Sequence, residues 1–159
     1  MVPIRQYRTF WEFVQLRIPE IKTVKVVSAE VQMQNFISEV QTDDVLLIAV
    51  IPSSETEASS VDDLEALSPC YIFVLKKTTR ADMDEEDRFS DQEVTQAIMN
   101  SIMELMWSLA EDFDHNDQYS RLMRRLNLNK MRVDPEYDTL GCNGWSLSFT
   151  LKTKGMFNE

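Results

Sequence analysis

The C-terminal segment alternates large apolar and small polar residues from Trp145 to Lys152. Side chains of a strand point to opposite faces with a period of two, so this pattern predicts a strand with one dry and one wet face. Antiparallel sheets commonly have such faces, whereas fully covered parallel sheets do not. The residues expected on the dry face are Trp145, Leu147, Phe149 and Leu151.

Two continuous apolar runs, Val45–Ile51 and Cys70–Leu75, predict strands that are buried on both faces. A further strand is expected at Leu128–Val133. A polar loop at 134–138 follows it. This loop, with the two glycines Gly141 and Gly144, is expected to connect that strand to the terminal strand. The core residues expected in the two apolar runs are Leu47 and Phe73.

Two segments space their apolar residues by three and four, which is typical of amphipathic helices. The first spans Ile4–Ile18 and ends before Pro19, because proline cannot continue a helix. The second is expected to begin at an N-cap formed by Ser90 or Asp91 and to continue to Phe113. The expected core residues of the two helices are Phe10, Trp11, Val14, Ile98, Ile102, Leu105 and Leu109.

The order of these elements predicts the α+β class, with an antiparallel or mixed sheet of four to five strands. The N-terminal helix and the long central helix are expected to pack on one face of that sheet. Residues 1–159 are expected to form a single domain, with a polar, mobile connector at 53–68 and a C-terminal tail at 154–159. The segment 22–40 fits both extended chain and a short helix near its end.

The chain has 27 acidic and 16 basic residues and a net charge of −11. A phosphate-binding face needs clustered Lys and Arg, so nucleic acid is not an expected partner. No apolar run approaches the length of a membrane span, and no basic-then-apolar leader is visible, so we expect a cytoplasmic protein that does not bind membranes. Cys70 and Cys142 are expected to be buried free thiols, which favours a reducing compartment.

The string Asp112–Asp117 is the most enzyme-like in the chain, yet it departs from a calcium-binding loop. Asp117 stands where the loop needs glycine, and Met123 stands where it needs glutamate. His115 is the single histidine, so one chain cannot supply a two-histidine metal site. The acidic run Asp82–Asp87 is interpreted as a solvated loop. We therefore expect no catalytic residue, no bound metal and no cofactor.

The layout of elements, with the strings Phe73–Lys77 and Gly144–Phe149, resembles prophage-encoded proteins of the tail-terminator or tail-completion group of tailed phages. The resemblance implies helices on one side of an antiparallel sheet and a ring that caps the tail tube or joins it to the head. The implied partners are other copies of the chain and other phage tail or head–tail proteins, with association with the virion. The resemblance transfers no functional residue, since both strings are structural.

Two classes of function are therefore expected. The first is a non-enzymatic structural subunit that forms a homo-oligomeric ring, with contacts through 53–68 or exposed parts of the sheet. The second is an acidic, monomeric, immunity-like adaptor or inhibitor that binds a basic protein, because complementary charge steers partners together. A hydrolase that uses clustered carboxylates and a divalent cation is the third and weakest alternative.

Overall fold

The computed structural model describes residues 1–28, 30–58, 64–78 and 84–154. Within these ranges the chain forms four helices and six strands and belongs to the α+β class, as predicted. The elements in chain order are α1 (Ile4–Arg17), β1 (Thr23–Val27), α2 (Glu30–Glu39), β2 (Val45–Val50), β3 (Glu55–Ala58), β4 (Leu64–Lys77), α3 (Glu85–Glu111), α4 (Gln118–Met123), β5 (Arg132–Thr139) and β6 (Cys142–Lys154).

All six strands belong to one mixed sheet with the order β1-β2-β4-β6-β5, and β3 pairs with the first part of β4. β1 runs parallel to β2, whereas every other pairing is antiparallel. The long central pair β4–β6 extends from Glu65 opposite Lys154 to Lys77 opposite Cys142. The sheet thus has one strand more than the predicted maximum of five.

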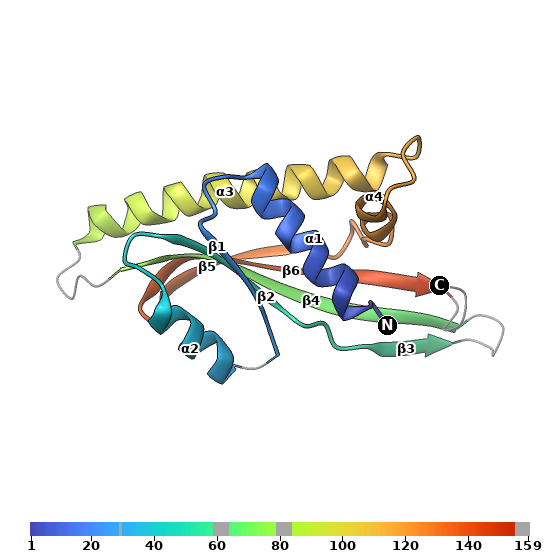
Figure 1. Cartoon of the computed structure of the whole chain (residues 1–159), viewed down its shortest axis with the longest axis horizontal. Helices are drawn as coiled ribbons and strands as arrows, with labels where there is room; N and C mark the ends of the chain where they lie inside the picture. The colour runs from blue at the N-terminus through green and yellow to red at the C-terminus, as the bar shows by residue number, and fades with distance from the viewer. Residues whose placement is uncertain (29, 59–63, 79–83, 155–159) are drawn as a thin grey trace.

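Helices α1 and α3 lie on one face of the sheet, and α2 lies on the other (Figure 1). Leu47 and Ala49 of β2 belong to the core under α1 and α3, while Leu46 and Ile48 belong to the core under α2. This arrangement explains why the apolar run of β2 has no alternation, because both of its faces are covered. The segment 22–40, for which extended chain and a short helix were both open, contains β1 and α2, whereas a helix on the second face of the sheet was not predicted.

The predicted core residues lie mostly in the cluster under α1 and α3. Nine of them are buried: Phe10, Trp11, Val14, Leu47, Ile98, Ile102, Leu147, Phe149 and Leu151. Four are partly buried: Phe73, Leu105, Leu109 and Trp145. Phe73 packs against the cluster under α2, whereas the other three pack against the cluster under α1 and α3. Trp145, Leu147, Phe149 and Leu151 all contribute to the cluster that contains α3, so the dry face of β6 faces this helix.

The N-cap of helix α3 lies six or seven residues before the position expected at Ser90 or Asp91. Asp84 is the N-cap, and its side chain accepts a hydrogen bond of 2.7 Å from the Asp87 backbone N–H. The acidic residues Glu85, Glu86 and Asp87 form the first helical turn, where negative charge is favoured by the helix dipole. This part of the acidic run is therefore helical and not a loop, and Asp82 lies outside the described residues.

Strand β5 includes Arg132 and Val133, the end of the strand predicted at Leu128–Val133, and it also occupies the segment 134–138 that was predicted as a loop. Residues 128–130 of the predicted strand form a turn and a bend. β5 is polar because it is an edge strand whose faces are largely open to solvent. The predicted connector 53–68 contains β3 and the start of β4, which pair as antiparallel strands, and its residues 59–63 lie outside the described residues. Of the predicted tail, Lys154 ends β6, and 155–159 lie outside the described residues.

Candidate functional site

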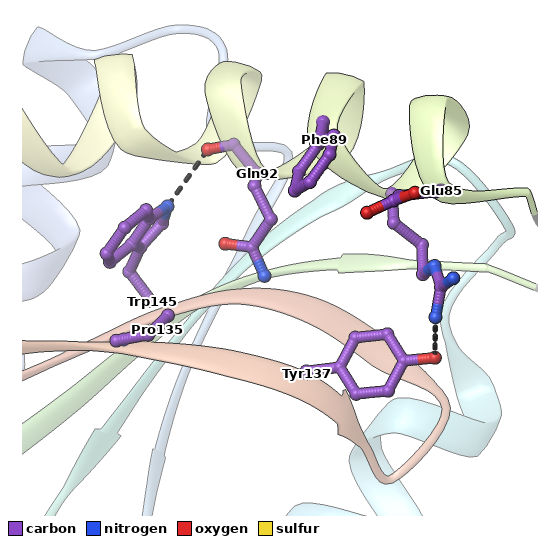
Figure 2. A pocket seen from close by; sticks show the side chains of 7 residues that line it. Glu85, Phe89, Gln92, Pro135, Tyr137 and Trp145 are labelled. Carbon is purple, nitrogen blue, oxygen red and sulfur yellow. Dashed lines mark hydrogen bonds between the residues drawn. The ribbon is translucent and has the colours of Figure 1, made fainter.

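A groove of about 470 Å³ lies between the first turns of α3 and the β5–β6 edge of the sheet (Figure 2). We call it the α3–β5 groove. Its walls come from three separate segments of the chain, and its floor is largely aromatic. The lining residues are Glu85, Arg88, Phe89 and Gln92 of α3, Pro135 and Tyr137 of β5, and Trp145 of β6.

Two hydrogen bonds hold α3 against the sheet at the inner end of the groove. The indole N–H of Trp145 donates to the backbone oxygen of Gln92 at 2.9 Å. The side-chain amide of Gln92 in turn donates to the backbone oxygen of Glu136 at 2.7 Å. The side chain of Trp145 lies on the face of β6 that points toward α3. The register of β6 in the sheet therefore fixes the position of the part of the groove that Trp145 forms.

An internal cation already occupies part of the aromatic surface. The Arg88 guanidinium carbon lies 5.0 Å from the centroid of the Tyr137 ring, and Arg88 Nη1 donates a hydrogen bond to the Tyr137 hydroxyl (Figure 2). Such a geometry is a cation–π contact. Phe89 and Tyr137 stay exposed at 58% and 59%, so their rings remain available to a partner.

Carboxylates dominate the two elements that border the groove. Four acidic residues lie at the start of α3, where Glu85 lines the groove: Asp84, Glu85, Glu86 and Asp87. On β5, Asp134 and Glu136 alternate with the groove-lining Pro135 and Tyr137, so their side chains belong to the opposite face of the strand. The basic residues in the same stretches are Arg88 and Arg132, and Arg132 forms an ion pair of 2.9 Å with Asp134. The groove therefore combines an aromatic floor with an acidic rim.

Next to Gln92 in the helix, Asp91 is only 5% exposed and forms an ion pair of 2.8 Å with Lys76 of β4. Its second oxygen, Oδ2, is buried without a hydrogen-bond partner in the described part of the chain. Removing one partner of such a pair would leave a buried charge without compensation. The pair thus contributes to holding α3 on the sheet, although no sequence pattern pointed to it.

The residues of the enzyme-like string 112–117 have structural contacts. His115 Nδ1 lies 2.8 Å from Asp112 Oδ2, and the hydrogen bond from the His115 side chain lowers the pKa of the Asp112 carboxyl. Arg124 donates to the backbone oxygens of Asp112 and His115, and it also reaches the Asn116 side chain. Asp117 accepts bonds from two N–H groups as the N-cap of α4. These contacts order the turn between α3 and α4.

No three His, Cys, Asp or Glu residues come close enough to hold a metal ion within the ranges described above. Of the helices in the same ranges, none is both long enough and apolar enough to cross a membrane.

Both thiols are free and buried, and they belong to cores on opposite faces of the sheet. Burial raises the pKa of Cys70 from 9.0 to about 12 and that of Cys142 to about 11, where the nearby Lys77 partly offsets the effect of burial. We expect iodoacetamide at mildly alkaline pH to leave both thiols unmodified in the native protein and to alkylate both in urea, as mass spectrometry would show. Alkylation of a native thiol at the unfolded rate would contradict this burial.

The raised pKa values of Cys70 and Cys142 determine how the free energy of unfolding changes with pH. The unfolded thiols ionise near 9.0, whereas the folded thiols keep their protons to higher pH. The unfolded state then binds fewer protons, so the free energy of unfolding falls as pH rises above about 9.

Comparison with family models gives no match, and neither does comparison with curated protein sequences. The resemblance to tail-terminator and tail-completion proteins therefore rests on the layout of elements and two short strings.

Sequence reasoning missed the α3–β5 groove. Phe89 lies outside the apolar stripe of the central helix, and Tyr137 is an isolated aromatic residue in a polar segment. Exposed aromatic residues of this kind are the signal that could have indicated a contact surface, although only the fold shows that they face one groove.

Proposed function

We propose that this chain is a non-enzymatic structural subunit of the tail-terminator or head–tail completion type, made in the cytoplasm and assembled into a homo-oligomeric ring on a virion. The observation that carries the proposal is the β3–β4 hairpin, which extends past α1 and α4 at the end of the molecule where the N-terminus lies (Figure 1). β3 pairs with β4 alone among the described strands, so its other backbone edge is open. An open edge is a template for pairing with another chain.

Of the two strands at the ends of the sheet order, β1 and β5, β5 is protected against such pairing. On β5, Pro135 lacks a backbone N–H and an irregular register separates Glu136 from Thr139, with Asp138 at a φ of 51°. Proline and bulges are the devices by which natural sheets protect their edges. β3 has neither feature over Glu55–Ala58, which favours the hairpin as the contact between subunits.

The arrangement of a projecting hairpin on one end of a subunit suits a heterologous contact, in which two different surfaces meet. Repeated head-to-tail contacts of this kind close into a ring when the rotation between subunits permits it. The chemical groups of the 112–117 string add support for a structural role, because their hydrogen bonds order a turn.

A second candidate function is an acidic adaptor or inhibitor that binds a basic protein. The acidic rim of the α3–β5 groove favours it, since clustered carboxylates attract a basic partner.

Sedimentation of the parent protein over a range of concentration and salt tests the ring proposal. We expect larger species at moderate than at low salt, because salt screens the repulsion between subunits of net charge −11. Thr56→Lys on β3 should reduce self-association, since lysine on an edge strand disfavours strand pairing.

Gln34→Lys on the exposed face of α2 is the matched control, because it changes the net charge equally away from the hairpin. Each substitution lowers the net negative charge, which by itself would promote association. A loss confined to Thr56→Lys therefore indicates a β3 contact. A parent protein that stays monomeric at high concentration in both salts would favour the adaptor.

A further inference from the structure

The α3–β5 groove joins two features that both attract cations. The first is its aromatic surface, where the exposed faces of Phe89 and Tyr137 lie beside Trp145. Aromatic faces carry negative electrostatic potential and bind guanidinium or ammonium groups. The second is the acidic rim at the start of α3, where Glu85 lines the groove and Asp84, Glu86 and Asp87 are its neighbours in the chain.

Arg88 shows how a guest would sit in the groove. Its guanidinium lies over the Tyr137 ring and donates to the Tyr137 hydroxyl. The aromatic wall is therefore shaped to accept a planar cation with several donors, which is the chemistry of an arginine side chain.

We infer that the α3–β5 groove binds an arginine-bearing segment of a partner protein, with the guest guanidinium competing with Arg88 for the face of Tyr137. Charge complementarity selects this occupant: a chain of net charge −11 repels acidic segments, and the rim adds local negative potential. The inference extends the second candidate function and does not rest on ring assembly. The start of α3 and the end of β5, which border the groove, lie at the end of the molecule away from β3 (Figure 1).

Binding of an arginine side chain in the groove differs from addition of a partner strand to the edge of the sheet. Pro135 and the irregular pairing of β5 disfavour a new strand on that edge, whereas the groove accepts a side chain without any change in the sheet. The groove thus binds the partner segment through its guanidinium side chains and not through backbone hydrogen bonds.

The test is a titration of ¹⁵N-labelled protein with a tri-arginine peptide, followed through the indole N–H signals of the tryptophans. Trp145 lines the groove, while Trp107 is exposed elsewhere on α3 and Trp11 is a buried residue of α1. We expect the Trp145 signal to shift in a saturable way, with the other two unchanged. Tri-glutamate should cause no shift.

Arg88→Gln gives the sharpest readout, because the expected sign is opposite for cationic and anionic guests. Removing the internal competitor should tighten tri-arginine binding about two- to fivefold, the range expected for an exposed cation–π contact. Arg8→Gln on α1 is the matched control, since it changes the net charge equally outside the groove. The difference between the two variants isolates the local effect from general attraction.

Phe89→Leu and Tyr137→Leu should each weaken binding about two- to fivefold, while Phe113→Leu, at an exposed site after the end of α3, should not. An intact amide spectrum checks that each variant is folded. The inference is overturned if Arg88→Gln weakens binding or matches Arg8→Gln, or if tri-glutamate shifts Trp145. It is also overturned if the Trp145 signal moves with protein concentration in the absence of peptide, because the occupant is then a second copy of the chain.

Discussion

Gly144→Ala is expected to destabilise the protein by about 3 kcal/mol or more, because the added methyl group has no space in the sheet. Gly144 lies in β6 opposite Leu75 of β4. A Cβ atom at this position would overlap the backbone oxygen of Val74 and lie 2.9 Å from the Leu75 Cα atom. Backbone atoms in the central strand pair cannot move aside as a flexible side chain can, so the two strands would have to separate locally. Urea unfolding followed by circular dichroism measures the effect.

Gly141→Ala is the matched control in the turn before β6. Gly141 has a φ of 77°, and nothing lies within 4 Å of the position that a Cβ would take. The cost of this substitution comes only from the left-handed backbone conformation, about 1 to 2 kcal/mol. If the two variants unfold at the same urea concentration, the close approach of β4 and β6 at Gly144 is wrong.

The role of Gly144 illustrates what the sequence could predict in this region. The alternation after it correctly predicted a strand, because one face of β6 is buried under α3 and α1. Glycine before such a run is typical of a turn, and Gly144 was therefore assigned to the loop. Its actual reason is tertiary: a close contact with a strand that is about 70 residues away in the sequence. No local pattern contains that information.

The edge strands escaped prediction for a related physical reason. β3 and β5 do not bury a continuous apolar face, so their sequences, such as Glu-Thr-Glu-Ala in Glu55–Ala58, resemble loops. By contrast, β2 and the main apolar stripe of α3 are covered on at least one side and keep a strong hydrophobic pattern. Burial produces the signal that sequence analysis detects, and edges have little of it.

The α3–β5 groove could not be predicted from the sequence, because it depends on contacts between distant segments and on an edge strand with a weak hydrophobic pattern. Phe89, Tyr137 and Trp145 come from three segments, and two of these were assigned differently, since Phe89 precedes the predicted helix and Tyr137 was placed in a loop. Only the early start of α3 at Glu85 and the register of β5 on β6 bring them to one groove. The candidate site thus depends on a helix cap and a strand pairing that the hydrophobic pattern does not specify.

Phe149→Ala should cost about 3 to 5 kcal/mol of the free energy of unfolding, the range for a large aromatic side chain removed from a core. Phe149 is 2% exposed and lies in β6, on the face that meets α1 and α3. Its ring centroid is 6.3 Å from that of Trp11 in α1, so the substitution removes a contact between the sheet and the N-terminal helix as well as apolar area.

The packed core around Phe149 limits how far the structure can relax when the ring is removed. Phe149 is opposite Cys70 in the β4–β6 pairing, and both belong to the same buried cluster. Atoms around the lost ring are held by the strand pair and by α1, so the structure can close only part of the cavity. We therefore expect a lower midpoint in urea with an unchanged slope, which indicates a change in stability and not in the compactness of either state.

Phe113→Ala removes the same side chain from a site that is 79% exposed and should change the free energy of unfolding by no more than about 0.5 kcal/mol. The difference between the two phenylalanines measures the core directly, since the chemical change is identical. Equal midpoints for the two variants would show that Phe149 does not lie between the sheet and α1, and that the dry face of β6 is assigned to the wrong side.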